Sequence, residues 1–457
     1  MLASFLSLLI CIFHFTLLNR NHSMKKLLTI LTMFAALGLA QAQSDLNTKA
    51  DKMAEEMEQQ VIEWRRYFHQ NPELSNREFE TAKKIAAHLE SLGMEVQTEV
   101  AKTGVVGILK GGKPGPVVAL RADIDALPVT ERTPVPFASK VVSEYNGVKT
   151  GVMHACGHDT HIAILMATAE VLSKMKKDLS GTVKFIFQPA EEGAPPGEEG
   201  GAKLMVKEGV LKNPDVDVAF GLHIAAGSPV GQINYKPGGI MAAADRFVIK
   251  VNGKQAHGST PWASVDPIVT AAQIINGLQT IVSRQTELTK EAAVISVGMI
   301  KGGVRNNIIP EEVEMIGTIR TLDTDMQKKI HEKIRLTATK IAESMGATAD
   351  VDIQIGYPVT YNDPELTTKM APTLERVAGK DQVQVVNAIT GAEDFSFFQK
   401  EVPGLYFFLG GKPLEAGDDG PKLGGHHTPD FYIDESGLVL GVKTMLNLTL
   451  DYMEMSN

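Results

Sequence analysis

The spacing of hydrophobic residues divides the chain into segments with different periods. Residues 45–93 hold two runs at helical spacing, KADKMAEEMEQQVIEWRRYFHQNPE and EFETAKKIAAHLESLG, which end near Asn71-Pro72 and at Gly93. Short apolar runs follow, namely VVGILKG, PVVALRADID, TVKFIFQPAEEG and VDVAFGLHI, and helix-like stretches such as HIAILMATAEVLSKMKKDL lie between them. This alternation of buried strands and helices predicts an α/β fold whose mostly parallel sheet is flanked by helices.

A second pattern begins near Gly238. DRFVIKVNGKQAHGS alternates like a half-buried strand with an Asn-Gly turn, and the helix DPIVTAAQIINGLQTIVSR follows it. The strands AAVISVGMIKGG and VEMIGTIRTLD precede the helix DMQKKIHEKIRLTATKIAESMG and the strand TADVDIQIG. This β-α-β-β-α-β order predicts a ferredoxin-like α+β unit. We therefore predict an inserted domain at residues 239–356 and a main domain formed by residues 43–238 and 357–457, whose sheet the run GLYFFLGG completes.

The N-terminal region has the pattern of a secretory signal. In MKKLLTILTMFAALGLAQAQ, two lysines precede a short apolar core, and Ala-Gln-Ala at 40–42 is an A-x-A cleavage site. We expect a signal peptide at residues 24–42 and an exported protein, either periplasmic or secreted. The alternative is a membrane anchor, although the core is short for a span of about 20 residues. Residues 1–23 lie upstream of this complete signal, so they reflect either an early start codon or an extension that tethers the protein.

Composition narrows the classes of partner. The net charge is −9 and no basic run stands out, which disfavours nucleic acid and anionic membrane surfaces as partners. Of the two cysteines, Cys11 precedes the predicted cleavage site, so the mature chain keeps only Cys156 and cannot form an internal disulfide. Cys156 is therefore either a buried bystander or a residue protected by a ligand.

Side chains that bind metals gather where predicted strands end. They are Cys156 and His158 in MHACGHDTH, Glu191 and Glu192 after VKFIFQPA, His223 after VDVAFGL, and His426 and His427 in GGHHTPDF. Thiolate, imidazole and carboxylate together suit a borderline ion such as Zn²⁺. Each residue alone could be an ordinary loop residue, and His154 and His161 could serve only in packing or hydrogen bonding. Their convergence at one edge of a sheet favours a metal site, which would also explain the single thiol.

Eight motifs in fixed order then identify a family resemblance. They are RRYFHQNPELSNREFET, RADIDALP, MHACGHD, QPAEEG, GLH, NNIIP, GAEDF and HHTPDF. Together they resemble the metallo-amidohydrolase family that includes aminoacylases, hippurate hydrolase, bacterial carboxypeptidases and plant auxin-conjugate hydrolases, in the branch with cysteine in HACGHD. The resemblance covers essentially the whole mature chain.

This resemblance implies a dinuclear metal site. Its ligands would be Cys156, His158, Glu192, His223 and His427, and its two divalent ions would be Zn²⁺, with Mn²⁺, Co²⁺ or Ni²⁺ as alternatives. Glu191 would be the general base that takes a proton from a metal-activated water. The main domain would then be catalytic, and the inserted domain would be a lid or dimerisation domain.

The resemblance also assigns roles within the inserted domain. His257 in QAHGSTPW resembles a histidine that stabilises the oxyanion, often from a partner subunit, which raises the possibility of a homodimer. Asn307 in NNIIP resembles an amide that contacts the substrate, and Arg320 in GTIRT resembles an arginine that binds the substrate carboxylate. Each could instead be a surface residue of a small domain. Trp262 stands where the branch usually has a second histidine, and APPGEEG lengthens the loop after Glu192, so the substrate is left open.

The sequence therefore predicts an exported, metal-dependent amidohydrolase that acts on the amide bond of N-acyl-amino acids or short peptides. One rival is an aminopeptidase or dipeptidase of the same fold, which would have to recognise a free amine. Another is a binding module without catalysis, which the complete ligand set disfavours. A third is a cysteine hydrolase using Cys156 and His158, which would leave the Glu191-Glu192 pair without a role.

Overall fold

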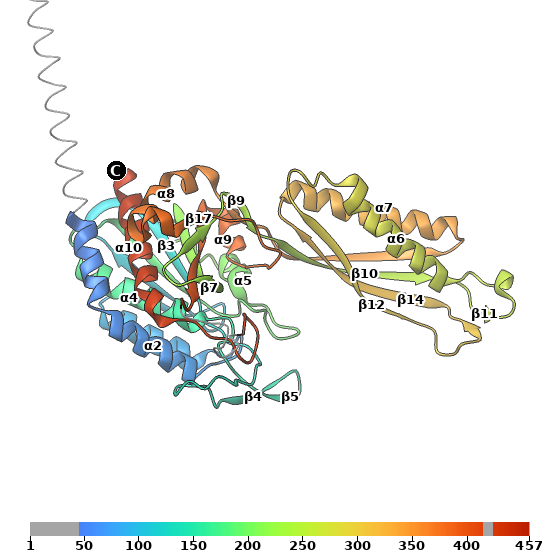
Figure 1. Ribbon diagram of the computed structural model, residues 1–457, viewed down its shortest axis with the longest axis horizontal. Coiled ribbons are helices and arrows are strands. Elements are labelled where there is room, and N and C mark those ends of the chain that lie inside the picture. The colour runs from blue at the N-terminus through green and yellow to red at the C-terminus, as the bar shows by residue number, and fades with distance from the viewer. Residues whose placement is uncertain (1–44, 415–423, 457) are drawn as a thin grey trace, which may run out of the picture.

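The computed structural model describes residues 45–414 and 424–456 and consists of two bodies joined by a narrow connection (Figure 1). The predicted signal peptide and the segment upstream of it lie outside the described residues. Within the described part of the chain, no helix has both the length and the apolar character needed to cross a membrane.

The main body is built on an eight-stranded sheet. Its strands, in spatial order, are β1 (Glu95–Val100), β2 (Gly104–Lys110), β6 (Ser180–Gln188), β3 (Lys113–Asp123), β7 (Val218–Pro229), β18 (Gly404–Lys412), β8 (Ile233–Tyr235) and β17 (Val383–Val385). The central strands β6, β3, β7 and β18 are parallel to one another, and β1 and β2 pair antiparallel with their neighbours. Strand β8 is antiparallel to β18 and parallel to β17. The carboxyl ends of the four central strands therefore meet at one edge.

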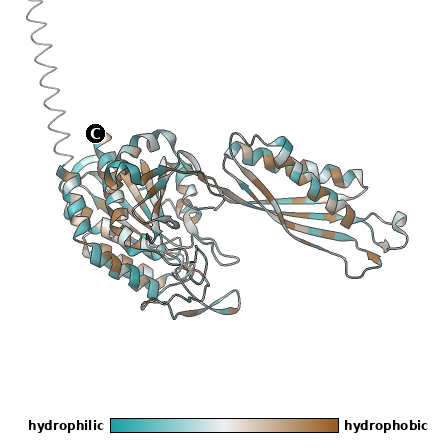
Figure 2. Cartoon of the chain, in the orientation of Figure 1, coloured by the Kyte–Doolittle hydropathy of each residue, from teal (hydrophilic) through white to brown (hydrophobic). Residues whose placement is uncertain are grey.

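Helices cover both faces of this sheet. One face packs against α2 (Glu58–Gln70), α3 (Phe79–Ser91), α4 (His158–Lys174), α8 (Pro364–Ala378) and α10 (Leu438–Met455). The other packs against the shorter α5 (Gly201–Lys207) and α9 (Ser396–Glu401). Strand β3 supplies Val118, Leu120 and Ala122 to the first core and Ala119 to the second, as alternation along a strand requires. In Figure 2 the outer helices alternate between hydrophilic and hydrophobic residues, as expected for helices with one buried face.

The second body is a four-stranded antiparallel sheet with two helices on one face. Its strands β10 (Ala243–Asn252), β12 (Ala293–Gly302), β14 (Glu312–Thr321) and β15 (Thr348–Tyr357) follow the order β12-β14-β10-β15. Helices α6 (Pro267–Gln285) and α7 (Thr324–Ser344) cover it and enclose a separate core. The side chains of Asp266 and Asp323 accept hydrogen bonds from backbone N–H groups in the first turns of α6 and α7, which explains where each helix begins. The predicted α/β fold with a ferredoxin-like second unit is thus confirmed.

Small elements connect and decorate the two bodies. The hairpin β4 (Val142–Tyr145) and β5 (Val148–Gly151) extends from the main body, and β11 (Ala256–His257) pairs with β13 (Ile308–Ile309) at the far tip of the second body (Figure 1). Short 3-10 helices span Pro261–Ala263, Lys380–Gln382 and Glu435–Gly437.

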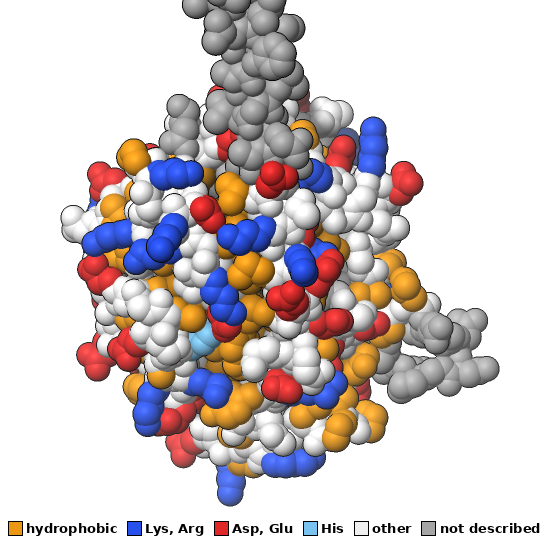
Figure 3. All heavy atoms as spheres, turned by 90° about the vertical axis from the view of Figure 1, so that its left-hand side faces the viewer, with side chains coloured by type: hydrophobic (Ala, Val, Ile, Leu, Met, Phe, Trp, Pro, Cys, Tyr) orange, Lys and Arg blue, Asp and Glu red, His pale blue; other side chains and the backbone are white. Residues whose placement is uncertain are grey.

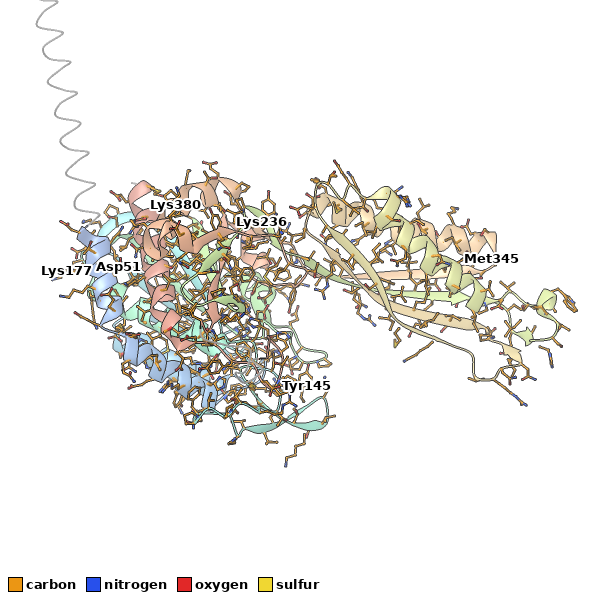
Figure 4. The ribbon with its side chains drawn as sticks, viewed as in Figure 1. Asp51, Tyr145, Lys177, Lys236, Met345 and Lys380 are labelled. Carbon is orange, nitrogen blue, oxygen red and sulfur yellow. The ribbon has the colours of Figure 1, made fainter. Side chains whose placement is uncertain are left out.

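The connection itself is a pair of crossing segments. Strand β9 (Gly238–Met241) pairs with β16 (Thr360–Asn362) just before the chain enters the second body and just after it leaves. Lys236 lies at this junction (Figure 4) and its Nζ contacts the Gly239 carbonyl at 2.8 Å and Glu291 at 2.9 Å. The predicted boundary at residue 239 falls in β9, and the one at residue 356 falls in β15, one residue before that strand ends. The division into these two domains stays a prediction.

On the face drawn in Figure 3, side chains of one charge do not gather into a patch. Basic and acidic side chains are interspersed there with single hydrophobic residues. No basic patch of the kind that binds a polyanion gathers on that face.

Candidate metal centre

The five predicted ligands lie together at the carboxyl edge of the main sheet. Cys156 Sγ is 3.3 Å from His223 Nε2 and 3.2 Å from His427 Nε2. His427 Nε2 is 3.0 Å from Glu192 Oε1, and His158 Nε2 is 4.0 Å from the same oxygen. Two groups of donor atoms within 4.8 Å of one another result, Cys156 with His158 and His223, and Cys156 with Glu192 and His427. The sulfur is common to both groups, and the ligand roles themselves stay a prediction.

The histidines are oriented with one nitrogen directed to this site. His158 Nδ1 donates to the Asp125 carbonyl at 2.9 Å, and His223 Nδ1 donates to the Ile224 carbonyl at 2.6 Å. In the neutral form of each ring, Nδ1 then carries the proton and Nε2 is free to bind a metal. His158 Nε2 is buried without a hydrogen-bond partner among the described residues. A buried ring nitrogen with no hydrogen-bond partner fits a bound cation.

Electrostatics at the site also favour a cation. Burial alone would lower the pKa of His158, but the carboxylates of Asp123 and Asp125 raise it to about 10. Burial and the neighbouring Glu192 and Glu191 raise the pKa of the Cys156 thiol well above its ordinary value. A thiol held in this way is a poor nucleophile, whereas coordination to a metal would deprotonate it. This environment of the Cys156 thiol therefore disfavours the hypothesis of a cysteine hydrolase.

The C-G-H motif has a structural reason. Gly157 has φ +94° directly before α4, and a Cβ at this position would lie 2.4 Å from Ile224 and 3.1 Å from Phe431. Only glycine fits this backbone and this space. The tight turn places Cys156 beside the strand ends and starts α4 with His158.

A loop presents Glu191 beside the ligands. Ala190 before it has φ +52°, in the left-handed region that non-glycine residues seldom adopt. Three side chains hold the loop by its backbone. Glu78 accepts from Ala190 N at 2.9 Å, Asp125 accepts from Glu192 N at 3.0 Å, and Tyr357 donates to the Glu191 carbonyl at 2.7 Å. Burial first, and then Glu393, raise the pKa of the Glu191 carboxyl well above its ordinary value.

A cavity of about 670 Å³ lies in front of these residues and between the two bodies. Cys156, Glu191 and His223 line it from the main body, and Arg320 lines it from β14 of the second body. Arg320 is the one arginine or lysine among its described lining residues.

His257 and Asn307 do not line this cavity. They lie on and next to β11 and β13 at the far tip of the second body (Figure 1), and His257 is exposed. The structure thus unites the predicted ligands, Glu191 and Arg320, and separates His257 and Asn307 from them.

Several supporting residues were not assigned from the sequence. Asp123 and Asp125 end β3 and follow it, and Asp125 also accepts from Ser75 at 2.7 Å. Their position in RADIDALP at a strand end was the available signal. His161, expected only to pack or hydrogen-bond, contacts Asp123 through Nδ1 and accepts from Ile224 N at 2.8 Å. His154 is fully buried, and burial lowers its pKa to about 4.

Comparison with known proteins agrees with this geometry. Residues 119–451 match the model of peptidase family M20/M25/M40. The chain is 43% identical to thermostable carboxypeptidase 2 of Saccharolobus solfataricus over 399 residues, covering 87% of this chain and 96% of that one. It is 38% identical to the N-acetylcysteine deacetylase of Bacillus subtilis over 397 residues, covering 86% and 97%. The structure of the Bacillus subtilis YXEP protein, described as a dinuclear metal binding peptidase, matches with a TM-score of 0.73 and 36% identity, covering 88% and 99%.

The fold and the site define a metal-dependent hydrolase of amides or peptides with a dimerisation-type second domain. The chain belongs to peptidase family M20/M25/M40. The family resemblance of the sequence motifs is thereby confirmed, and the two divalent ions fit a family that includes a dinuclear metal-binding member.

Because the Asp125 side chain contacts both His158 and the Glu192 backbone, its removal should weaken metal binding. Asp125→Ala keeps the backbone carbonyl but removes the carboxylate that contacts His158 Nδ1 at 3.2 Å and accepts from Glu192 N at 3.0 Å, so affinity for Zn²⁺ should fall by about 10–100-fold. Competition with a chromophoric chelator measures it, and Asp178→Ala, which removes a surface ion pair with Lys49, is the matched control. A folded Asp125→Ala protein with unchanged affinity would contradict this supporting role.

Proposed function

We propose that this protein hydrolyses the amide bond of N-acyl-amino acids or short peptides that carry a free carboxylate. The observation that carries the proposal is one cavity lined by metal-ligand side chains, a carboxyl group and an arginine, which are Cys156, His223, Glu191 and Arg320 among others. The first three lie on the main body and the arginine on the second body, so a substrate between them would contact both.

Two divalent ions would be held by Cys156, His158, Glu192, His223 and His427. When bound, they would supply Lewis acidity for the carbonyl and lower the pKa of the attacking water. The presence of Cys156 in both donor groups supports its assignment as a ligand. Sulfur, nitrogen and oxygen donors favour Zn²⁺, with Mn²⁺, Co²⁺ and Ni²⁺ as the alternatives.

Glu191 would act as the general base and then as the general acid. Its carboxylate takes a proton as the water oxygen bonds to the acyl carbon, and returns it to the leaving nitrogen as the C–N bond breaks. The positive charge of bound cations would offset the burial that raises its pKa, so that the carboxylate form is available.

Arg320 supports a substrate with a carboxylate. Its planar guanidinium can bind both carboxylate oxygens. A free amine, which an aminopeptidase must recognise, has less support. Glu393, the acidic lining residue besides the Glu191-Glu192 pair, is already bonded to Arg121 at 2.9 Å and to Tyr406 at 2.5 Å.

Export remains part of the proposal. It rests on the charged, apolar and A-x-A pattern of residues 24–42. N-terminal sequencing of the mature protein would test it, since processing predicts a start at Gln43.

The metal dependence gives the direct test of the proposed activity. Chelation should abolish hydrolysis of an acyl-amino acid panel, and Zn²⁺, Mn²⁺ or Co²⁺ should restore it. Substrates with a free carboxylate should be cleaved in preference to their C-terminal amides because of Arg320. Full activity in metal-free protein would refute the metal mechanism, and a preference for substrates with a free α-amine would favour the aminopeptidase.

Replacement of Glu191 and replacement of Glu192 should affect turnover and metal content differently. Glu191→Gln should lower turnover by about 10²–10⁴-fold and keep the metal content, because only the proton acceptor is lost. Glu192→Gln should lower the metal content as well, because a ligand is lost. Elemental analysis and kinetics on the same samples measure both, and near wild-type turnover by Glu191→Gln would refute its assignment.

A homodimer would give His257 and Asn307 a role. The tip that carries them also exposes Trp262, at 82%, and Val304, at 94%, and exposed apolar side chains of this size are typical of contact surfaces. We propose that the second body pairs two chains so that His257 of one chain reaches the cavity of the other.

Mixing two inactive variants tests this pairing. Glu191→Gln and His257→Ala homodimers should each be nearly inactive, and subunit exchange should restore activity, because one cavity of each mixed dimer has both groups. A mixture that stays inactive while mass measurements show mixed dimers would contradict a partner-supplied His257.

A further inference from the structure

One buried polar side chain of the cavity has an unused hydrogen-bonding atom. Asn234 is 7% exposed and lines the same cavity as Glu191 and His223. Its Nδ2 donates to Ser228 Oγ at 2.9 Å, whereas its Oδ1 is buried with no partner among the described residues. A buried carbonyl oxygen left unpaired is costly, so this oxygen needs an explanation.

The register of the sheet fixes where Asn234 lies. His223 on β7 is paired with Phe408 on β18, and Phe408 is paired with Asn234 on β8. The neighbours Ile233 and Tyr235 pack into the opposite core, so Asn234 points to the cavity side. Adjacent strands are about 4.7–4.9 Å apart, which puts Asn234 two strands, or about 10 Å, from the proposed metal ligand.

The space between these ends is apolar. Phe408 forms the middle of the row, with its ring centroid 6.5 Å from that of His223. Met241, Val386 and Ile389 also line the cavity. A substrate group that runs from the metal centre to Asn234 would cross a hydrophobic surface and meet a hydrogen-bond acceptor at its end.

We propose that Asn234 is a specificity-determining residue that accepts a hydrogen bond from a hydroxyl or N–H at the far end of an aromatic substrate group. This inference rests on the proposed function, because the amide under attack sets the near end of the substrate. A site built to bond such a donor rejects the analogue that lacks it, because the acceptor is then left buried and unpaired. Apolar walls alone would discriminate weakly between the two.

Matched substrate pairs test the proposal in metal-loaded protein. The pairs are N-acetyl-tyrosine with N-acetyl-phenylalanine, and 4-hydroxybenzoyl-glycine with benzoyl-glycine. We expect the hydroxyl member of at least one pair to have a kcat/KM about tenfold or more above its partner. The pair that responds identifies which half of the substrate faces Asn234. 4-Methoxybenzoyl-glycine, which accepts but does not donate, should behave like the member without a hydroxyl or worse.

Variants connect the preference to this residue. Asn234→Leu should abolish or reverse the preference for the hydroxyl member, and Asn234→Ala provides a second variant if Asn234→Leu does not fold. Gln384→Leu is the matched control, because Gln384 is paired with Asn234 on the next strand but is exposed and does not line the cavity. Its selectivity should stay at the wild-type value.

The outcomes separate this inference from the proposed function. Equal ratios in the wild type and both Asn234 variants would overturn it, and a preference for the methoxy compound would overturn the donor assignment. If no compound is hydrolysed, calorimetry on the same compounds decides. Binding with an Asn234-dependent preference for the hydroxyl member would refute only the amidohydrolase proposal, and binding without that preference, or no binding, would overturn the role of Asn234.

Discussion

A concentration of buried carboxyl groups at one sheet edge is the constraint on which the site depends. They include Asp123, Asp125, Glu191, Glu393 and Asp394, all less than 10% exposed. Arg121, itself buried, bonds to Asp123, Glu393 and Asp394 and pairs with part of this group. Buried charge must be paired or must coordinate metals. Asp123, Asp125 and Glu191 also lie within 4 Å of a ring nitrogen of His158, and this is why the edge is suited to cations.

The same buried carboxyl groups hold the loop of Glu191. Asp125 contacts His158 through its carbonyl and its carboxylate and accepts from Glu192 N, so His158 and the loop share one support. Tyr357, the last residue of β15, bonds to the Glu191 carbonyl and thereby contacts the loop from the end of the second body. The position of Glu191 is thus linked to the connection between the two bodies.

The sequence pattern predicted the two units because helix and strand periods are local signals. It placed Glu192 after a strand, where the structure has it, but it also expected His223 after a strand, whereas β7 continues through His223 to Pro229. The ligand roles stay a prediction. Asp125 could not be assigned, because its role depends on which neighbour its side chain meets. Asn234 lies on a three-residue strand, too short for any alternation to show. The distance of His257 from the cavity depends on the relative placement of the two bodies, which a hydrophobic pattern does not encode.

The central claim of the proposal is that Cys156, His158, Glu192, His223 and His427 hold two divalent ions. Anomalous diffraction from crystals loaded with Zn²⁺, recorded on both sides of the zinc absorption edge, measures it directly. The account predicts two peaks among these five side chains, with the Cys156 sulfur as one of the ligands. A single peak, or two peaks of which neither contacts this sulfur, would contradict it.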